Sequence, residues 1–399
     1  MELREADQKT MREIYLDNQS VARPSDKVLE KIVSSLKRGR WNDHFATHIP
    51  DKNVFEEIEA AYKALYKLVD AHHEDQFVLT SSGAEAVNHA VFAAYLDITR
   101  KTGKNHFVAA NIDERAALSS MSRLKEMGCV FHMAPANEKG IIDCAAIADT
   151  ITPRTAMLSL SWANGLTGVI QPVSKIAQLC HDRGILFHVD ATHMLGIGND
   201  LFAQSGAAIL TFDGCALHGP YGSGGLFIQR DLKLSPFIMG SDDQGGMRGG
   251  PIFLGTLLAL AEAAKETLHF RDHLSTEIAR LRSHFETAMT ERIPSMSVLF
   301  EEVERVPHIS TLAFPGVMNA SLLFWLAREK VFATIGGQGF QNLATLLQAC
   351  HVKASLAHSS LSFGFSRGTS QEEIAIVCEK LTSGVHHLQK YSKQLNKWD

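Results

Sequence analysis

The sequence LTFDGCALHGPYGSGGL, residues 210–226, decides how this chain folds. The apolar residues 207–212 are typical of a buried strand, and the apolar residues 226–228 begin another strand after it. Between the two, the Gly- and Pro-rich residues 219–225 predict a turn. A phosphate-binding loop would need a Lys-Ser/Thr pair and a following helix. Neither pattern is present, so we interpret these glycines as structural.

Strand and helix patterns alternate on the amino-terminal side of this stretch. Short strands are predicted at residues 77–79, 106–110, 130–133, 156–160 and 185–189. Helices are predicted at residues 26–36, 54–69 and 142–150, and from residue 84 onward. Such alternation is typical of an α/β fold with a mostly parallel sheet.

A smaller α+β domain is predicted on the carboxy-terminal side. Residues 252–292 have an apolar-rich helical pattern, and alternation then returns. Strands are predicted at residues 311–314 and 331–334, and helices at residues 320–328 and 371–389. We place the boundary before the long helical region, which gives a large domain over residues 1–255 and a small domain over residues 256–399.

Composition and charge exclude several classes of protein. The 399 residues are 45% hydrophobic and 21% charged, which is ordinary for a globular chain of two or three domains. The net charge of −5 is spread over both signs, and no basic stripe suits nucleic acid. No run of 18 apolar residues occurs, and the first residues are charged. We therefore expect a cytoplasmic protein that binds neither nucleic acid nor membranes.

The cysteines predict neither a metal site nor a disulfide framework. They are scattered without a CxxC pair, at positions 129, 144, 180, 215, 350 and 378. Cys350 lies on the apolar face of a helical pattern, which favours a core position. We assign no metal ligands in this chain.

A candidate anion site follows the first predicted strand. Residues 80–83 form a small-residue turn, and a helical pattern begins at Ala84. Free backbone N–H groups and the helix dipole both favour an anion at such a helix end. We therefore select Gly83 and Ala84 as candidate anion-binding residues.

Residues 210–226 resemble the active-site stretch of the cysteine desulfurases and other class V aminotransferases. In that family a serine, a histidine and a lysine precede the Gly-Pro pair, and the lysine holds pyridoxal 5'-phosphate (PLP) as an imine. Those three positions here hold Asp213, Cys215 and Ala216. A methyl group cannot form an imine. The resemblance implies a fold type I PLP-transferase-like α/β fold, with a seven-stranded-type sheet in the large domain and a smaller α+β domain.

Other motifs extend the resemblance through most of the chain. SSGAEAVN, residues 81–88, resembles the family's phosphate-binding segment and implies that Gly83 and Ala84 face the PLP phosphate. HVDATHMLG, residues 188–196, resembles the segment whose aspartate bonds the pyridine nitrogen. The resemblance gives that role to Asp190, and gives His193 a hydrogen bond to the ring oxygen.

Two further cofactor positions differ from the family pattern. Where the family has a histidine that stacks on the pyridine ring, this chain has Arg115, whose guanidinium can lie flat on an aromatic ring. The asparagine that lies near the cofactor's phenolic oxygen corresponds to Gly165, with Asn164 one residue away. The resemblance therefore implies cofactor contacts from Arg115 and Asn164 in altered form.

Three more family positions are replaced. A threonine that reaches the partner subunit's PLP phosphate corresponds to Pro251, and the arginine that clamps the substrate carboxylate corresponds to Ser362. The loop that carries the sulfur-accepting cysteine, residues 335–340, contains no cysteine. Arg367 matches a second family arginine and is a weak substitute for the first.

We predict that PLP binding is weak or absent. Asp213 stands where the family donates a hydroxyl to the phosphate, and two unit charges about 5 Å apart at an effective dielectric constant near 20 repel by roughly 3 kcal/mol. We also predict that the Asp213 carboxylate reaches the helix end at Gly83 and fills the place of the phosphate.

Two functions remain open at this point. The favoured one is a non-catalytic family member that acts as a binding or regulatory protein, because several site residues are replaced together. The alternative is a PLP-dependent transferase or lyase whose lysine was substituted, or one that uses His218 or His193 as its base. We expect a homodimer with residues 248–252 at its interface. A further partner would be a sulfur-transfer protein or an active relative.

Overall fold

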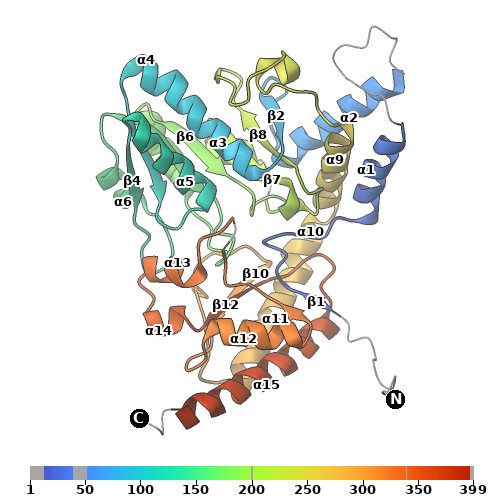
Figure 1. The fold of residues 1–399 in the computed structure, drawn as a ribbon, viewed down its shortest axis with the longest axis vertical. Helices are drawn as coiled ribbons and strands as arrows, with labels where there is room; N and C mark the ends of the chain where they lie inside the picture. The colour runs from blue at the N-terminus through green and yellow to red at the C-terminus, as the bar shows by residue number, and fades with distance from the viewer. Residues whose placement is uncertain (1–12, 39–51, 199–200, 338, 396–399) are drawn as a thin grey trace, which may run out of the picture.

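The computed structural model describes residues 13–38, 52–198, 201–337 and 339–395. Figure 1 shows two parts, a larger one built on a wide sheet and a smaller one that contains the carboxy-terminal helix. None of the helices among these residues has the length and apolar character needed to cross a bilayer.

The larger part contains a mixed sheet of seven strands. They are β2 (Gln76–Thr80), β3 (His106–Ala110), β4 (Val130–Ala134), β5 (Thr155–Ser161), β6 (Leu186–Asp190), β7 (Ile209–Asp213) and β8 (Gly224–Ile228). Their spatial order is β2-β8-β7-β6-β5-β3-β4. Strand β8 is antiparallel to both neighbours, and the other pairs are parallel. The predicted mostly parallel α/β sheet is confirmed.

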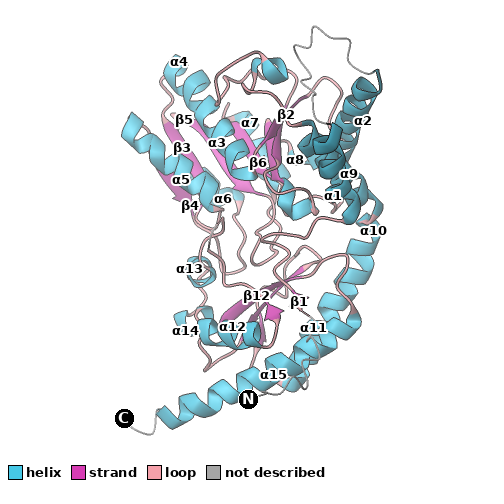
Figure 2. Cartoon of the chain, turned by 45° about the vertical axis from the view of Figure 1, so that its right-hand side comes forward, coloured by secondary structure: helices cyan, strands magenta, loops and turns pink. Residues whose placement is uncertain are grey.

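Helices cover both faces of this sheet (Figure 2). They include α3 (Gly83–Ala94), α4 (Arg100–Thr102), α5 (Arg115–Arg123), α6 (Cys144–Thr150), α7 (Val173–Asp182) and α8 (Leu201–Ser205). Alternate residues of one strand point to opposite faces. In β3, Phe107 therefore packs in the apolar cluster that contains α3 and α5, whereas Val108 packs in the cluster that contains α6 and α7. Both faces of β3 are buried, which accounts for its apolar character.

Three further helices pack together beside the sheet. They are α1 (Asp26–Arg38), α2 (Lys52–Val69) and α9 (Leu254–His269), and α9 contacts both of the others. The chain continues from α9 through α10 (Arg271–His273) and a π-helical segment (Leu274–Ile278) into α11 (Ala279–Arg292). This run matches the helical region predicted from the sequence.

The smaller part has a separate apolar core. Strands β9 (Ser297–Val298), β10 (Ile309–Ala313) and β12 (Ser360–Gly364) form an antiparallel sheet in the order β12-β10-β9, and β1 (Ile14–Tyr15) pairs in parallel with β11 (Val331–Phe332). The helices are α11, α12 (Asn319–Arg328), α13 (Leu343–Ala349), α14 (Ala354–Ala357) and α15 (Gln371–Leu395). Phe285 packs edge-on against Phe363 and Phe365 at the centre of this core.

The long helical run passes from one apolar core into the other. Leu257 and Leu260 of α9 belong to the core of the large sheet, whereas Ile278 and Phe285 belong to the small core, together with Ile14 from the amino-terminal segment. The domain division at residues 255 and 256 stays a prediction. After α9, the side chains of the helical run pack in the small core instead of the core of the large sheet.

Candidate functional site

Two aspartates lie side by side where neighbouring parallel strands end. Asp190 is the last residue of β6, and Asp213 is the last residue of β7. Thr192 joins them: its Oγ1 hydroxyl donates to Asp190 Oδ1 at 2.6 Å and accepts from the Asp213 backbone N–H at 3.0 Å. The carboxyl ends of parallel strands are the usual place for ligand sites in α/β folds.

The Asp213 carboxylate occupies the amino terminus of α3. Its Oδ2 accepts a hydrogen bond from the Gly83 backbone N–H at 2.8 Å, and its Oδ1 accepts one from the Cys215 N–H, also at 2.8 Å. A Cβ atom on residue 83 would lie 2.8 Å from the Asp213 Cβ, so glycine is required for this approach. Our prediction that Asp213 reaches this helix end is confirmed.

His193 and Glu114 form a second polar pair at the same edge of the sheet. The His193 Nε2–H donates to Glu114 Oε1 at 3.0 Å, and the imidazole lies 5.6 Å from the ring of Phe340. Burial, and then the charge of Glu114, raise the pKa of Asp190. The site therefore holds two carboxyl groups, those of Asp190 and Glu114, close enough for their negative charges to repel each other.

Two adjoining cavities open at this edge. The first, with a volume of about 580 Å³, is lined by Gly83, Ala84, Arg115, Asp190 and Asp213. The second, of about 160 Å³, is lined by His193, Ala216 and again Asp213. Thr192, Glu114 and Gly339 lie on both. The structure thus brings together seven of the residues selected from the sequence.

Asn164, Cys215 and His218 do not line these two cavities. The Asn164 amide is used within its own loop, where Oδ1 accepts from the Leu166 and Thr167 N–H groups and Nδ2 donates to Ile112 O. A side chain on Gly165 would meet His193 Nε2 at 2.3 Å. This loop therefore has no room for the family's asparagine with His193 in its present position.

A short 3-10 turn, Gly214–Leu217, follows β7. Burial, followed by the charge of Asp213, raises the pKa of Cys215 to about 12, which keeps the thiol protonated. His218 has a left-handed backbone with φ of 59°, and its Nδ1–H donates to Arg23 O at 2.8 Å. Burial, followed by the charge of Arg367, lowers the pKa of His218.

The remaining positions taken from the family pattern are buried, bonded to other parts of the chain, or exposed at the surface. Ser362 is buried in β12, and its hydroxyl donates to Leu166 O at 2.6 Å. Cys350 is buried next to α13, as predicted, and burial raises the pKa of its thiol to about 12. Pro251 is exposed. Arg367 pairs with Glu266, at 2.5 Å between Nη2 and Oε2.

Apart from the contact of Asp213 with Gly83, sequence reasoning did not find the partners of the site residues. Thr192 is part of the quoted motif HVDATHMLG, but its two hydrogen bonds depend on how β6 and β7 pair. Asp113 is buried, accepts from the Ser161 and Ala110 N–H groups, and has a pKa raised by burial to about 7. Its place three residues after the end of an apolar strand was the available signal.

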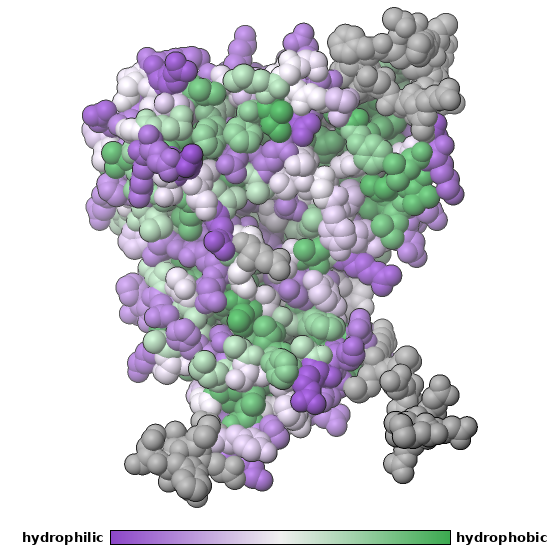
Figure 3. All heavy atoms as spheres, viewed as in Figure 1, coloured by the Kyte–Doolittle hydropathy of each residue, from purple (hydrophilic) through white to green (hydrophobic). Residues whose placement is uncertain are grey.

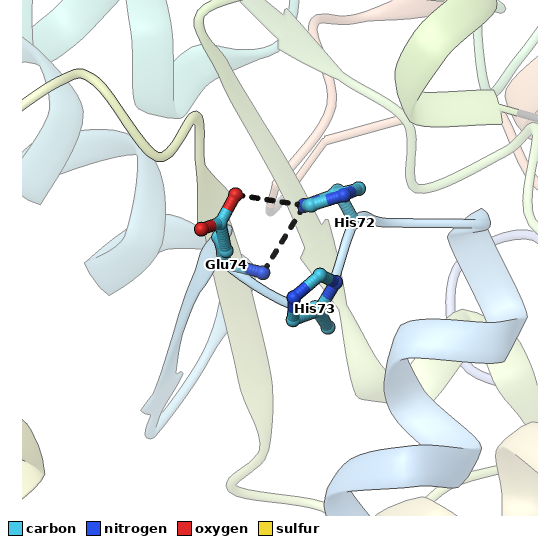
Figure 4. Close-up of side chains that lie close together, drawn as sticks. All are labelled: His72, His73 and Glu74. Atoms are coloured by element: carbon cyan, nitrogen blue, oxygen red, sulfur yellow. Dashed lines mark hydrogen bonds and ion pairs between the residues drawn. The ribbon is translucent and has the colours of Figure 1, made fainter.

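A separate polar cluster lies at the other end of β2. His72, His73 and Glu74 are the one group of potential metal ligands whose atoms lie close together among the described residues (Figure 4). His72 Nδ1 lies 3.5 Å from Glu74 Oε2 and accepts from the Glu74 N–H. All three residues are exposed and adjacent in sequence, so water competes at every position. We assign no role to this cluster.

The comparisons with known proteins agree on one family. The aminotransferase class-V family matches residues 14–377. Cysteine desulfurase NifS of Azotobacter vinelandii is 26% identical over 385 residues, which cover 96% of this chain and 95% of the relative. A cysteine desulfurase of Gluconacetobacter diazotrophicus is 27% identical over 386 residues, 96% of each chain.

Solved structures share the fold. A NifS-like protein has a TM-score of 0.85 at 20% identity, with 93% of this chain and 99% of that chain covered. The apo structure of a cysteine desulfurase from Thermococcus onnurineus NA1 has a TM-score of 0.81 at 16% identity, with 94% and 95% covered. The arrangement of the seven-stranded and smaller sheets is therefore that of NifS-like proteins.

Proposed function

We propose that this chain, which belongs to the aminotransferase class-V family, lacks the family's standard catalysis. It acts instead as a binding or regulatory protein. Its relation to the cysteine desulfurases is at about 26% identity. One observation carries the proposal. The family resemblance assigns an anion to the amino-terminal end of α3. In this chain the Asp213 carboxylate is hydrogen-bonded to that helix end.

The residues at this edge do not fit PLP, which the family normally binds. The Gly83 N–H is already satisfied, and a phosphate placed there would meet the carboxylate of Asp213. Residue 216 lines the cavity with a methyl group and offers no amine. Because both the phosphate and the aldehyde of PLP lack their partners, we expect no tight complex.

Two other cofactor candidates, Asp190 and His193, already have hydrogen-bond partners within the protein. Asp190 accepts from both the N–H and the hydroxyl of Thr192, and His193 donates to Glu114. A pyridine ring would have to compete with these contacts. They supply a reason for the retention of Asp190 and His193 that does not depend on a cofactor.

A second candidate function is a PLP-dependent transferase or lyase with a histidine base. One observation favours His193 over His218 for that role. Among the described residues, His193 Nδ1 has no hydrogen-bond partner and its ring lines the cavity beside Ala216, whereas His218 donates its Nδ1–H to a backbone carbonyl.

An absorption spectrum distinguishes the two functions. Purified protein is titrated with PLP, dialysed, and scanned in the near-visible range, with an unrelated lysine-rich protein as the control for non-specific binding. The first proposal predicts no retained absorbance. Retained stoichiometric PLP, with turnover of an amino acid that is lost in His193→Gln, would support the second.

We also propose that the chain forms a homodimer through α1. Leu29, Val33 and Leu36 share one face of this helix and are 45%, 47% and 62% exposed. Figure 3 shows a hydrophobic area over this helix. A second copy of this chain is the proposed partner, and an active relative with the same fold is the alternative. The predicted place of residues 248–252 at this interface stays a prediction.

A further inference from the structure

Strand β4 is an outermost strand of the seven-stranded sheet, because it pairs with β3 on one side only. Figures 1 and 2 show it on the side of the larger part that lies away from α1 and α2. The Val130 N–H and the Ala134 carbonyl are bonded to residues next to β3, each at 2.9 Å. Because the bonding direction alternates along a strand, the backbone N–H and C=O groups of Phe131 and Met133 point away from the sheet.

The two edges of this sheet differ in how their backbone groups are satisfied. At the β2 edge, the Leu79 N–H donates to Gln244 Oε1 at 2.7 Å, and the Leu79 carbonyl accepts from Gln244 Nε2 at 2.9 Å. That side-chain amide takes the place of a neighbouring strand. At the β4 edge, no described residue outside the sheet is hydrogen-bonded to the backbone of Phe131 or Met133.

The side chains of β4 do not protect its open edge. Natural sheets protect an exposed edge with lysine, proline, inward-pointing charges or a bulge. The sequence of β4 is VFHMA, which contains none of these residues, and its pairing with β3 is regular. Val130 is 44% exposed and Met133 is 52% exposed. An uncharged edge of this kind is a template for the addition of another strand.

We propose that a second copy of this chain adds its own β4 to this edge, antiparallel, about a two-fold axis at His132. In that register Phe131 of one copy lies opposite Met133 of the other. Both residues point their backbone groups outward, so the pair exchanges two N–H···O bonds, and the two-fold axis generates the pair twice. His132 lies opposite its own copy, at the non-hydrogen-bonded position between the two pairs.

Side chains in this register match those of a second copy. Each Phe131 ring lies opposite a Met133 thioether, and sulfur–aromatic contacts are favourable. The strand has no acidic or basic side chain apart from the imidazole, so the two-fold axis opposes no pair of carboxylates, ammonium groups or guanidinium groups. His132 Nδ1 lies 3.1 Å from His106 Nε2, which holds that imidazole against its own sheet. Lys125, which precedes the strand, has its ammonium 5.6 Å from the centre of the Phe131 ring.

The size of the contact predicts weak association. The strand contributes five residues from each copy. Stable interfaces use roughly 20–30 residues per partner, so we expect a dissociation constant on the order of 100 µM or weaker. The β4 edge lies away from α1, the helix of the proposed homodimer. Association at β4 therefore joins α1 dimers into larger assemblies at high protein concentration, and the two proposals can fail separately.

Cross-linking tests the register. His132→Cys is introduced into a Val33→Glu background, which removes any contribution of the α1 surface. Residues opposed at a non-hydrogen-bonded position have Cα atoms about 4.5 Å apart, within the range for a disulfide. Mild oxidation should therefore give a covalent dimer on a non-reducing gel. Val130→Cys, exposed on the same face of the strand, is the matched control. It should give at least tenfold less dimer, because residue 130 lies opposite residue 134.

Sedimentation equilibrium tests the association without oxidation. The mass of Val33→Glu should rise with protein concentration, and circular dichroism establishes that each variant is folded. Met133→Lys places a charge at the edge and should weaken the association at least tenfold, whereas Met239→Lys, at another exposed methionine, should leave it within twofold. Equal cross-linking of His132→Cys and Val130→Cys would reject the two-fold register. A Val33→Glu chain that stays monomeric at high concentration but binds an extended peptide would assign the edge to another protein's strand and overturn the proposal.

Discussion

The carboxylate of Asp213 accepts a hydrogen bond from the backbone N–H of Gly83 at 2.8 Å, across 130 residues of chain. One residue ends a strand and the other begins a helix, so the contact joins the two structures that would otherwise offer an open anion site. A negative side chain at a helix amino terminus satisfies an unpaired donor and interacts favourably with the helix dipole. The chain thus supplies its own anion at the helix end that the family resemblance assigns to a phosphate.

The first prediction concerns the stability that this contact provides. Asp213→Ala removes an acceptor from the Gly83 and Cys215 N–H groups, and we expect it to lower the free energy of unfolding by about 1–3 kcal/mol. Inorganic phosphate should then stabilise the variant and not the parent, because the helix end is open. Urea denaturation with and without phosphate measures both. Asp213→Asn keeps one acceptor, so its free energy of unfolding should lie between those of the parent and Asp213→Ala. A phosphate effect of equal size in the parent would contradict the assignment.

Local patterns predicted the elements of the large sheet well. β3 occupies residues 106–110, as expected, because a buried strand bounded by polar residues is visible in the sequence itself. The expected strand at residues 331–334 is shorter: only Val331 and Phe332 pair with β1. That pairing joins residues more than 300 positions apart, and no local pattern contains it.

The candidate site was predictable only in part, for the same reason. Asp213 could be placed near Gly83 because the family resemblance assigns both positions to the cofactor phosphate. The partner of His193 is Glu114, and the partner of Arg367 is Glu266. Each pair joins separate segments, and a single sequence holds no information on such pairings.

A second prediction uses a histidine in the centre of the sheet. His188 is fully buried between Ser159 Oγ and Thr211 Oγ1, and burial lowers its pKa to about 3. A folded-state pKa below the unfolded value gives stability that is present at neutral pH and is lost as the pH falls toward 3. Between pH 7 and 4.5 this group alone costs roughly 2–3 kcal/mol.

His188→Gln should therefore have a flatter dependence of unfolding free energy on pH over that range. Denaturant midpoints measured at pH 7 and pH 4.5 test this. His181→Gln, on an exposed side chain, is the matched control and should keep the parent's pH dependence. A His188 variant with the same pH dependence as the parent would show that the imidazole is not buried in the neutral form.

A third prediction concerns association. Light scattering at micromolar concentration should give twice the mass of one chain. Val33→Glu places a charge on the exposed apolar face of α1 and should produce monomers, whereas Lys31→Glu, two positions away on a different face, should leave the dimer intact. A monomeric parent would remove the homodimer proposal, and dissociation by both variants would point to charge alone.

Fourth, we expect no sulfide release from cysteine, even with added PLP. Residue 216 provides no amine, and no described thiol lies at the site: Cys215 is held protonated, and Cys350 is buried in the core. Sulfide is measured against a no-protein control, with Cys215→Ser as the matched variant. Release above the control that disappears in Cys215→Ser would identify that cysteine as a sulfur acceptor.

The last prediction separates a rebuilt site from a single substitution. If Ala216 alone differed from an active relative, Ala216→Lys would restore an imine and turn the protein yellow when PLP is added. We expect the single variant to stay colourless, because the Asp213 carboxylate still occupies the Gly83 N–H and opposes a phosphate by roughly 3 kcal/mol at about 5 Å. Ala216→Lys combined with Asp213→Ser and Pro251→Thr removes that charge and adds two hydroxyl groups, and it should bind PLP with an imine absorption band. The comparison of Ala216→Lys with Ala216→Lys/Asp213→Ser isolates the carboxylate. Tight, coloured binding by Ala216→Lys alone would mean that the phosphate site had been intact throughout, and that Asp213 moves aside at little cost.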